Sequence, residues 1–488
     1  MPKADELKVI ALPGRGRVDM NILDAIRDGK VFGQHFTADT WAAWLAFLCA
    51  LFALPMTGEQ LELYRKHTGR SVRPSSPLSE AWLVCGRRSG KSFMLACIAV
   101  WLAAFKDWRP FLGPGEIGTI MIIAADRKQS RVIMRYCCGL LKSVPMLRQL
   151  IEGETQESIQ LRNRVCIEVH TASFRSTRGY TIVAGLLDEV SFWPVDESSS
   201  SPDVEVLNAI RPGMSTIPGA MLLCASSPYA RRGALWDAHR KHYGKDGDPI
   251  LVWQAATREM NASVAQSIID AAVEEDPARA AAEWSAQFRS DVESFIAREV
   301  VEAAMVPGRY ELPPVSGTNY VAFCDPSGGS SDSFTLAIAH RDKDDRCVLD
   351  VVREARPPFS PEQTVETFAA LLNSYGILRV GGDKYAGEWP REQFRKHGGI
   401  TYEPSEKPKS DLYRDLLPLL NSGRIELLDH QPLVAQACGL ERRCARGGRE
   451  SIDHAPGARD DLINAVAGVA AATNRGKYRY DSTLSWVG

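Results

Sequence analysis

The stretch 81–92, AWLVCGRRSGKS, constrains the fold of this chain more than any other part of the sequence. An apolar run leads into a short loop of small and basic residues, the loop ends in Gly90-Lys91-Ser92, and an apolar helical pattern follows. A strand, a glycine-containing loop and a helix in this order form a phosphate-binding loop. In such a loop backbone N–H groups surround the phosphates, the lysine reaches the outer ones, and the serine hydroxyl holds Mg²⁺. The usual pattern places glycine where this chain has Cys85, so a basic surface turn is the alternative interpretation.

After this loop the sequence alternates between short apolar runs and helical patterns. Apolar runs of this length between turn signals indicate strands that are buried on both faces. We expect strands at 118–126, 181–187, 220–225 and 250–256, a hairpin at 158–173, and a helix at 127–141. This order predicts an α/β domain with a mostly parallel sheet. The resemblance described below implies a P-loop ATPase of the ASCE type.

The composition changes in the middle of the chain. Residues 261–305 are rich in Ala and Glu, and 306–317 (VPGRYELPPVSG) carry prolines and glycines without an apolar period. Such a stretch marks a domain boundary, and 488 residues suffice for two or three domains. We predict an ATPase motor domain with N-terminal helices at 1–260, a helical linker region at 261–314, and a second domain at 315–488.

The second domain has a different order of elements. We expect a meander of three strands at 319–324, 334–340 and 346–352, then a helix at 361–375. Further elements are expected as strands at 378–381 and 400–403, a helix from 410, a hairpin-like stretch at 424–428, and a helix from 460. The β-β-β-α-β-α order predicts a mixed α/β domain. Carboxylates follow two of its strands and begin its last helix.

Charge and cysteine usage limit the class of protein. The formal net charge is −2, so no overall basic field indicates nucleic-acid binding, although local patches can suffice. The eleven cysteines form no C-x₂-C pair and lie mostly in apolar runs, and there is no signal peptide, so we expect reduced thiols in a cytoplasmic protein. Residues 41–56 carry no charge, but a membrane-spanning helix needs about 20 residues, so we expect a buried helix and no membrane association.

Polar residues that follow two apolar runs are candidates for ATP hydrolysis. Asp188 would hold Mg²⁺ together with Ser92, and Glu189 would polarise the attacking water. Ser226 and Ser227 would sense the γ-phosphate and couple its loss to motion. The alternatives are a helix N-cap for the acidic pair and an ordinary turn before proline for the serines.

Other residues near the loop are candidates for nucleotide contacts. Gln60 precedes the loop, and its amide can read an adenine edge, although an exposed helical glutamine is the commoner explanation. Arg87 and Arg88 can touch the γ-phosphate or a neighbouring element. The predicted nucleotide-binding residues are Gln60, Arg87, Arg88, Ser89, Gly90, Lys91, Ser92 and Asp188. The candidates for an arginine finger that reaches an adjacent subunit are Arg127, Arg131, Arg175 and Arg178, any of which can equally be a solvated surface residue.

Carboxylates of the second domain form a second candidate site. Asp325 and Asp383 each follow an apolar strand, and Asp460 and Asp461 begin a late helix. Together they can hold two Mg²⁺ or Mn²⁺ ions, which clamp the attacking and leaving oxygens of a phosphodiester and activate water. His454 is a possible assisting acid or base. Candidates for contacts with the phosphate backbone are Lys407, Lys409, Arg442, Arg443, Arg446 and Arg449, for which a solvated face is equally plausible.

Taken together, these motifs resemble the large terminase subunit of tailed bacteriophages or prophages, over nearly the whole chain. CGRRSGKS is similar to the family's deviant Walker A, which carries an arginine four places before the lysine, here Arg87. LLDEVSFW resembles its Walker B, CASSP its coupling motif, and Gln60 its adenine-reading motif. AFCDPSGG, GGDKYAGEW and HAPGARDDLINA resemble the acidic motifs of its RNase H-like nuclease.

The resemblance implies a set of activities and partners. A large terminase uses ATP and Mg²⁺ to thread concatemeric double-stranded viral DNA into a procapsid, and a two-metal nuclease cuts that DNA. The implied partners are double-stranded DNA, the small terminase subunit, the portal protein and further copies of the chain in a ring, all in the host cytoplasm. The resemblance does not say which of Asp460 and Asp461 ligates metal.

Two other functions fit part of the sequence. A helicase–nuclease of DNA repair would need further helicase motifs and a second motor domain, for which little chain remains before the second domain. A non-catalytic, DNA-binding assembly scaffold would need neither Lys91 nor the acidic residues that both predicted sites retain.

Overall fold

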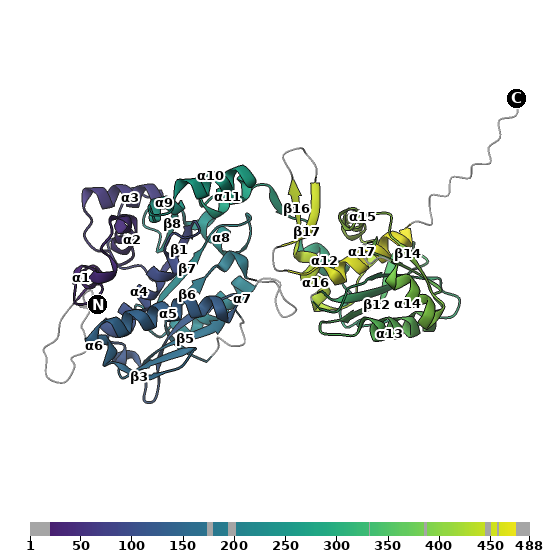
Figure 1. The fold of residues 1–488 in the computed structure, drawn as a ribbon, viewed down its shortest axis with the longest axis horizontal. Coiled ribbons are helices and arrows are strands. Elements are labelled where there is room, and N and C mark those ends of the chain that lie inside the picture. Colours follow the sequence, from purple (N-terminus) through teal and green to yellow (C-terminus); the bar gives the residue numbers. More distant parts are fainter. Residues whose placement is uncertain are drawn as a thin grey trace, which may run out of the picture. The chain divides into compact units, whose positions relative to one another are not determined.

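A computed structural model describes residues 20–172, 179–193, 202–330, 332–384, 388–444, 450–455 and 458–474 (Figure 1). The chain divides into two compact units, the first extending to Ser290 and the second beginning at Asp291 apart from a short segment at 195–200. Residues 261–314, the predicted linker, are therefore divided between the units, and each unit is described by itself below.

The first unit contains strands and helices in alternation. Its strands are β1 (Glu80–Cys85), β2 (Gly118–Ala124), β3 (Ile151–Glu154), β4 (Ser158–Leu161), β5 (Val165–Thr171), β6 (Thr181–Asp188), β7 (Met221–Ser226) and β8 (Ile250–Ala255). The helices that precede β3 in the chain are α1 (Ile22–Arg27), α2 (Ala42–Leu51), α3 (Gly58–Thr68), α4 (Lys91–Phe105), α5 (Arg127–Ser143) and α6 (Pro145–Arg148). The later helices are α7 (Pro202–Met214), α8 (Gly233–His242), α9 (Thr257–Met260), α10 (Gln266–Glu275) and α11 (Pro277–Glu283). Short 3₁₀ turns lie at Gly33–His35, Asp39–Trp41, Arg109–Phe111 and Val190–Phe192.

The eight strands form one sheet in the order β3-β4-β5-β2-β6-β7-β1-β8. All pairs from β5 to β8 along this order are parallel, and only β3–β4 and β4–β5 are antiparallel. The predicted mostly parallel sheet is confirmed, and so is the predicted hairpin at 158–173. Since β6, β7 and β1 are neighbours, their carboxyl ends meet at one edge of the sheet.

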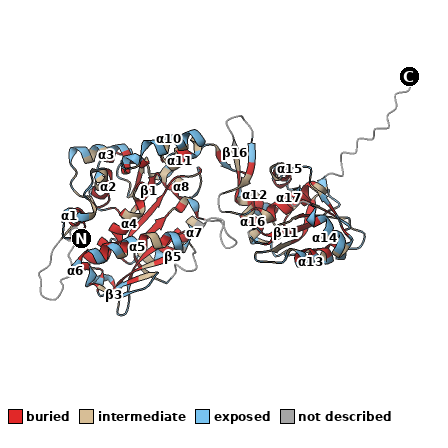
Figure 2. Cartoon of the chain, viewed as in Figure 1, coloured by how far each residue is buried: buried red, intermediate tan, exposed pale blue. Residues whose placement is uncertain are grey.

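Both faces of this sheet are covered. Along β1, the side chains of Ala81, Leu83 and Cys85 enter one hydrophobic cluster, and those of Trp82 and Val84 enter another. Helices α4 and α5 pack in the first cluster, and α7 and α8 in the second. Figure 2 shows the central strands and α4 as mostly buried. Burial on both faces explains why β1 is a continuous apolar run.

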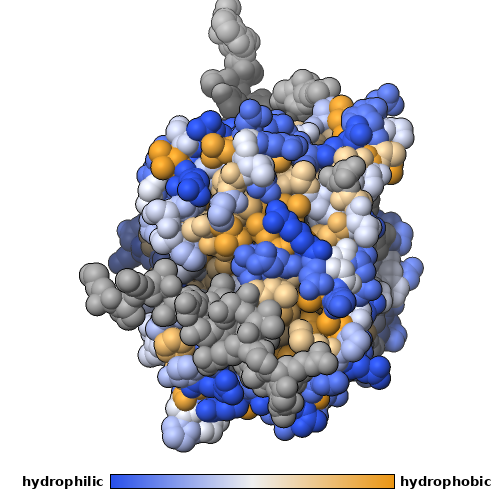
Figure 3. All heavy atoms as spheres, turned by 90° about the vertical axis from the view of Figure 1, so that its left-hand side faces the viewer, coloured by the Kyte–Doolittle hydropathy of each residue, from blue (hydrophilic) through white to orange (hydrophobic). Residues whose placement is uncertain are grey.

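The uncharged stretch 41–56 contains the buried helix α2, which ends at Leu51, so the predicted buried helix is confirmed. Among the described residues, no helix is long and apolar enough to cross a membrane. Met20, Phe36, Trp41 and Leu45 are partly buried against the core of the first unit. On the face of this unit that Figure 3 presents, hydrophobic residues gather centrally among hydrophilic ones.

The second unit is a mixed α/β structure. Its strands are β9 (Val292–Ser294), β10 (Tyr320–Asp325), β11 (Phe334–Arg341), β12 (Cys347–Ala355), β13 (Arg379–Gly382), β14 (Thr401–Pro404), β15 (Ile425–Glu426), β16 (Leu440–Cys444) and β17 (Glu450–His454). Its helices are α12 (Arg298–Ala304), α13 (Pro361–Ser374), α14 (Trp389–Gly398), α15 (Lys409–Asn421), α16 (Gln431–Cys438) and α17 (Asp461–Asn474). Six strands form a sheet in the order β14-β13-β10-β11-β12-β15, and β17-β16-β9 form a second sheet.

The large sheet of the second unit contains the predicted meander β10-β11-β12, which is antiparallel. The predicted hairpin-like pair at 424–428 is wrong, because β15 pairs instead with β12 in parallel. Two residues of strand are too short to carry a pattern that distinguishes these pairings.

Helix α17 packs across β10 through a glycine. A Cβ atom at Gly468 would overlap the ring of Phe323 in β10, so only glycine lets the helix lie this close to the strand. The contact brings the first residue of α17, Asp461, toward the end of the sheet at which β10 terminates in Asp325.

Candidate functional site

The predicted phosphate-binding loop connects the central strand β1 to helix α4. Gly90 has a φ of +98° at the start of α4, a conformation that favours glycine. The ammonium of Lys91 is buried and donates to the carbonyl oxygens of Cys85 (3.0 Å) and Gly86 (3.1 Å). It also lies 3.4 Å from Oγ of Ser227 at the end of β7. The lysine is therefore held at the carboxyl edge of the sheet.

The acidic pair at the end of β6 lies beside this lysine. Ser92 Oγ donates to Asp188 Oδ2 at 3.2 Å, and Lys91 Nζ lies 3.6 Å from Glu189 Oε1. Burial, followed by the charge of Glu189, raises the pKa of Asp188 to about 7. The other oxygen of Asp188 is buried without a hydrogen-bond partner among the described residues. A buried carboxylate oxygen of this kind suits a divalent cation or its water shell.

The two serines at the end of β7 contact Glu189 directly. Glu189 Oε2 accepts hydrogen bonds from Ser226 Oγ (3.2 Å) and from the backbone N–H of Ser227 (3.1 Å). Since Ser227 also contacts Lys91, the serines, the lysine and the glutamate form one connected cluster. The structure thus brings together the residues that the sequence predicted for ATP hydrolysis and coupling.

The middle of the loop is held by residues that the sequence analysis did not identify. Arg87 NH1 lies 3.1 Å from Glu283 Oε2 in α11, and the backbone N–H of Arg87 donates to the carbonyl oxygen of Glu283. Thr257 Oγ1 donates to the carbonyl oxygen of Arg87, and Asn261 Nδ2 to that of Arg88, each at 2.8 Å. The segment after β8 therefore fixes the backbone of the loop.

Ser89 faces the N-terminal helices. Its carbonyl oxygen accepts a hydrogen bond of 2.9 Å from the indole of Trp44 in α2. Its hydroxyl is buried and has no hydrogen-bond partner among the described residues.

The position of glycine in the loop has a steric explanation. A Cβ atom at Gly86 would overlap Thr257 Oγ1 and lie 2.7 Å from the carbonyl oxygen of Trp284. Cys85 needs no such freedom, because it ends β1 and its side chain is fully buried in the core. The close approach of the loop to the segment after β8 therefore occurs one residue later than the usual motif implies.

Gln60 has a structural role in addition to any contact with a base. It is the third residue of α3, where its side-chain oxygen accepts from the backbone N–H of Thr57 and Thr57 caps the Gln60 N–H, a reciprocal capping box. Its amide NH₂ group makes no hydrogen bond to the described residues and remains a potential donor.

Of the four arginine-finger candidates, only the side chain of Arg131 lies within the described residues. Arg131 forms an ion pair of 2.9 Å with Glu157, which occupies its guanidinium. Arg175 and Arg178 lie outside the described residues, as does the side chain of Arg127. The geometry of the described part therefore selects none of them.

The carboxylates of the second unit gather at the ends of β10 and β13. Asp325 is the last residue of β10, Asp383 follows β13, and both line a cavity of about 700 Å³. Asn464 of α17 donates to Asp325 Oδ2 at 2.8 Å. Burial raises the pKa of Asp325 to about 7, helped by the charges of Asp383, Asp461 and Asp460. This crowding of carboxylates is favourable only when cations or protons offset it.

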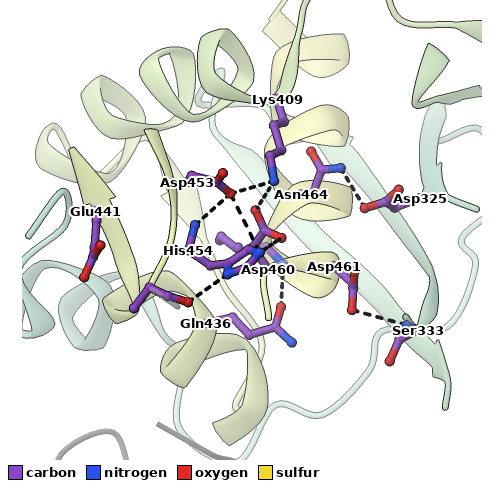
Figure 4. Close-up of polar contacts among 12 residues, drawn as sticks. Asp325, Ser333, Lys409, Gln436, Glu441, Asp453, His454, Asp460, Asp461 and Asn464 are labelled. Carbon is purple, nitrogen blue, oxygen red and sulfur yellow. Dashed lines mark hydrogen bonds and ion pairs between the residues drawn. The ribbon is translucent and has the colours of Figure 1, made fainter. Parts of the chain in front are cut away.

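The adjacent residues Asp460 and Asp461 have different surroundings (Figure 4). Asp460 is buried and accepts from Lys409 Nζ at 3.0 Å and from Tyr413 OH at 2.8 Å. Asp461 Oδ2 accepts from the backbone N–H of Ser333 at 3.3 Å, and burial raises its pKa to about 6. Both carboxylates add to the charge around Asp325, but Asp460 is also occupied by two side-chain hydrogen-bond donors.

His454 lies beside Asp460. Ligand atoms of Asp453, His454 and Asp460 lie within 4.8 Å of one another, an arrangement that can hold a metal ion. However, the ammonium of Lys409 already lies 2.7 Å from Asp453 and 3.0 Å from Asp460. A lysine in this place supplies the positive charge that a metal ion would otherwise provide.

The predicted phosphate-backbone cations are partly engaged within the protein. Lys407 pairs with Asp415 at 2.6 Å, and Arg443 pairs with Glu441 at 3.2 Å and donates to the carbonyl oxygen of His454. Arg442 lies 4.0 Å from Glu450. Arg446 and Arg449 lie outside the described residues.

Comparison with known proteins gives matches only among solved structures. No protein-family model matches the chain, and no curated protein does. The large terminase of bacteriophage HK97 is 16% identical, with 81% of this chain and 91% of that chain covered and a TM-score of 0.36. The large terminase of the thermophilic bacteriophage D6E is 12% identical, with 86% and 99% covered and a TM-score of 0.36.

A further match covers about a third of the chain. The large terminase nuclease of the thermophilic phage G20c is 16% identical, with 35% of this chain and 95% of that chain covered and a TM-score of 0.31. Structures of the D6E protein with ADP and with ATP-gamma-S, and of the G20c nuclease with magnesium, also match. All of these solved structures are bacteriophage large terminases or their nuclease domains.

Proposed function

We propose that this chain is a large terminase subunit, which couples ATP hydrolysis to movement of double-stranded viral DNA into a procapsid and cuts that DNA. The observation that supports this most is the joint placement of Lys91, Glu189 and Ser227 at one sheet edge, in a chain that also carries a carboxylate-lined cavity. A motor and a nuclease in one chain are what packaging and cutting require.

In the first unit each residue of the cluster has a role that follows from its contacts. Lys91 neutralises charge on the outer phosphates of ATP, and Glu189 accepts a proton from the attacking water. Ser92 and Asp188 hold Mg²⁺, which screens the phosphates when bound. Ser226 and Ser227, which contact Glu189 directly, relay the loss of the γ-phosphate to β7.

Arg87 and Gln60 complete the nucleotide site in this proposal. Arg87 moves from Glu283 to the γ-phosphate, a stronger partner because it carries more negative charge. Gln60 uses its NH₂ group for the adenine edge while its oxygen continues to cap α3. Arg88, Ser89 and Gly90 contribute the backbone around the phosphates.

In the second unit Asp325, Asp383 and Asp461 hold two Mg²⁺ or Mn²⁺ ions, which activate water and stabilise the leaving oxygen when bound. The raised pKa values of Asp325 and Asp461 fit this role, since cations relieve crowded carboxylates. Asp460 instead anchors the start of α17 through Lys409 and Tyr413. His454 is close enough to Asp460 to assist this anchoring.

The proposal includes partners that packaging needs. Double-stranded DNA is the substrate, and the portal protein, the small terminase subunit and further copies of the chain in a ring are the proteins that act with it. The site of action is the host cytoplasm.

The test is a double dissociation of two activities in the full-length chain. Glu189→Gln should abolish ATP-dependent release of phosphate while plasmid nicking in Mg²⁺ or Mn²⁺ persists. Asp325→Ala should abolish nicking while ATP hydrolysis persists. Asp344→Ala is the matched control, because this carboxylate is exposed and lies outside the cavity.

Three outcomes would contradict the proposal. A wild-type chain that hydrolyses ATP but never cuts DNA would leave only a translocase, such as a helicase. A chain with neither activity would be a scaffold with vestigial sites. Loss of nicking in Glu189→Gln with normal ATP turnover would show that the two sites are assigned to the wrong units.

A further inference from the structure

The cavity at the candidate nuclease site has a wall of a different chemical character. Asp325 and Asp383 line the cavity, and so do Trp389 and Pro390, the first two residues of α14. An acidic site for metal ions therefore lies next to an indole.

Trp389 is not required by the hydrophobic core. It is 38% exposed and is absent from both core clusters of the second unit, whereas Pro390 and Phe394 of the same helix are buried. Of the tryptophans that the structure describes, Trp389 is the only one with an exposed side chain. An indole that stays exposed beside the carboxylates gains no hydrophobic free energy, which a ligand would provide by covering it.

Two glutamates near the indole already have cationic partners. Glu388, which precedes Trp389, pairs with Arg391 at 2.8 Å, and Glu362, which lines the same cavity, pairs with Lys396 at 2.7 Å. The indole wall is thus apolar and not strongly negative, so a flat, uncharged group can approach it without repulsion.

The chemistry of the substrate identifies that group. The groups next to a phosphodiester in DNA are sugars and nucleobases, and of these the base presents a flat π face. In a duplex the faces of a base are covered by its neighbours, so the base next to the cut must first leave the stack, at a cost on the order of a few kcal/mol that contact with an aromatic side chain offsets. Such stacking is favourable for every base, so it suits a nuclease that does not read sequence. The indole is a large stacking surface, and it is rigid once its two side-chain torsions are fixed.

We propose that Trp389 stacks on a base next to the phosphodiester that is cut and so holds the strand in register with the carboxylates. This inference rests on the proposed nuclease function and adds a substrate-binding residue that acts through the base. Asp325 and Asp383, which line the same cavity, would hold the ions that act on the phosphodiester, and Trp389 would fix the distance between the DNA backbone and the cavity wall.

The test couples a change in the protein to a change in the DNA. Cleavage positions of a short labelled duplex are first mapped with the full-length chain in Mn²⁺, and the bases next to the main cut are then replaced by abasic residues. On the intact duplex, Trp389→Leu should lower kcat/KM about 10-fold, and Trp389→Phe by no more than about threefold. On the abasic duplex, the wild type should lose about 10-fold and Trp389→Leu should lose nothing further.

The controls separate stacking from damage to the fold. Tyr310→Leu removes another exposed aromatic side chain, 71% exposed and outside the cavity, and should leave both rates unchanged. Thermal unfolding compares the stability of the Trp389 variants, and the abasic substrate leaves the protein unaltered.

Two results overturn the inference, and they are distinguishable. If the wild type and Trp389→Leu lose the same factor on the abasic duplex, the indole does not contact that base while the nuclease assignment stands. If the wild type cuts neither duplex in Mg²⁺ or Mn²⁺, the nuclease function fails and this inference fails with it.

Discussion

Replacing Asp325 with asparagine should make the second unit more stable although it destroys the proposed metal site. The carboxylate of Asp325 is partly buried, and three further carboxylates raise its pKa together with that burial. Asparagine has nearly the same shape, carries no charge, and can still accept the hydrogen bond from Asn464 Nδ2. The substitution therefore removes an unfavourable buried charge and keeps the packing.

The size of the effect follows from the pKa of Asp325. A value of about 7 lies about 3 above the ordinary aspartate value of 3.8, and each pKa unit corresponds to about 1.36 kcal/mol. At pH 8 without metal ions, the free energy of unfolding should therefore rise by up to about 4 kcal/mol in Asp325→Asn.

The sign of the pH dependence follows from linkage. Because the folded chain holds the proton of Asp325 more tightly than the unfolded chain, this group contributes its stability fully below about pH 4. That stability is lost as the pH rises toward and through about 7. The gain from asparagine should thus be near zero at pH 4 and largest at pH 8, and Mg²⁺ should stabilise only the wild type.

Calorimetry of the full-length chain with EDTA, at several pH values, measures this prediction. In Asp325→Asn, which lacks the proposed metal site of the second unit, an ATP analogue with Mg²⁺ should shift only the transition of the first unit and so identifies it. In EDTA, the other transition should differ between this variant and the wild type. The control is Asp342→Asn in the same unit. Burial alone would raise the pKa of Asp342, but hydrogen bonds from Arg346 lower it, so its loss should destabilise the unit. An Asp325→Asn variant that is less stable at pH 8, or equally stabilised at pH 4 and 8, would refute the reasoning.

Three further predictions concern particular contacts. In thermal unfolding, Gly86→Ala should destabilise the first unit by about 1–3 kcal/mol, because its Cβ overlaps the segment after β8, and it should abolish ATP turnover. The control Gly139→Ala, with nothing near its Cβ, should be neutral or stabilising. Glu283→Gln should lower KM for ATP several-fold in steady-state kinetics, because it frees the loop guanidinium, and an unchanged KM would exclude this competition. Asp461→Asn should abolish plasmid nicking in Mn²⁺ while Asp460→Asn retains part of it, and the reverse order would reassign the ligand.

Elements with a strong local pattern were predictable from the sequence. Strand β1 and the helix after the loop were predicted as they are found, because an apolar run and a basic loop precede an apolar helix. The edge hairpin of β16 and β17 was not predicted, since β16 reads Leu-Glu-Arg-Arg-Cys and lacks an apolar alternation. Its pairing with β9 joins residues far apart in the chain, for which local sequence carries no signal.

The sequence predicted which residues form the candidate sites and their order along the chain. It did not predict where their side chains point. Asp460 and Asp461 are neighbours at the start of a helix, where successive side chains point about 100° apart, so the sequence cannot say which of them faces Asp325. The role of Glu283 was also hidden, because an Ala- and Glu-rich helix indicates exposure and not a contact with a loop nearly 200 residues earlier. A residue that acts through tertiary contact leaves no periodic signal.

The cysteine in the phosphate loop has a consequence for chemistry in the cell. Burial raises the pKa of the Cys85 thiol to about 12, so at neutral pH only about one molecule in 10⁵ carries the reactive thiolate. Its sulfur is also sealed inside the core, out of reach of peroxide and of alkylating reagents. A cysteine next to the proposed phosphate-binding loop would usually make that site sensitive to oxidation, but oxidation of Cys85 itself should not inactivate the proposed ATPase.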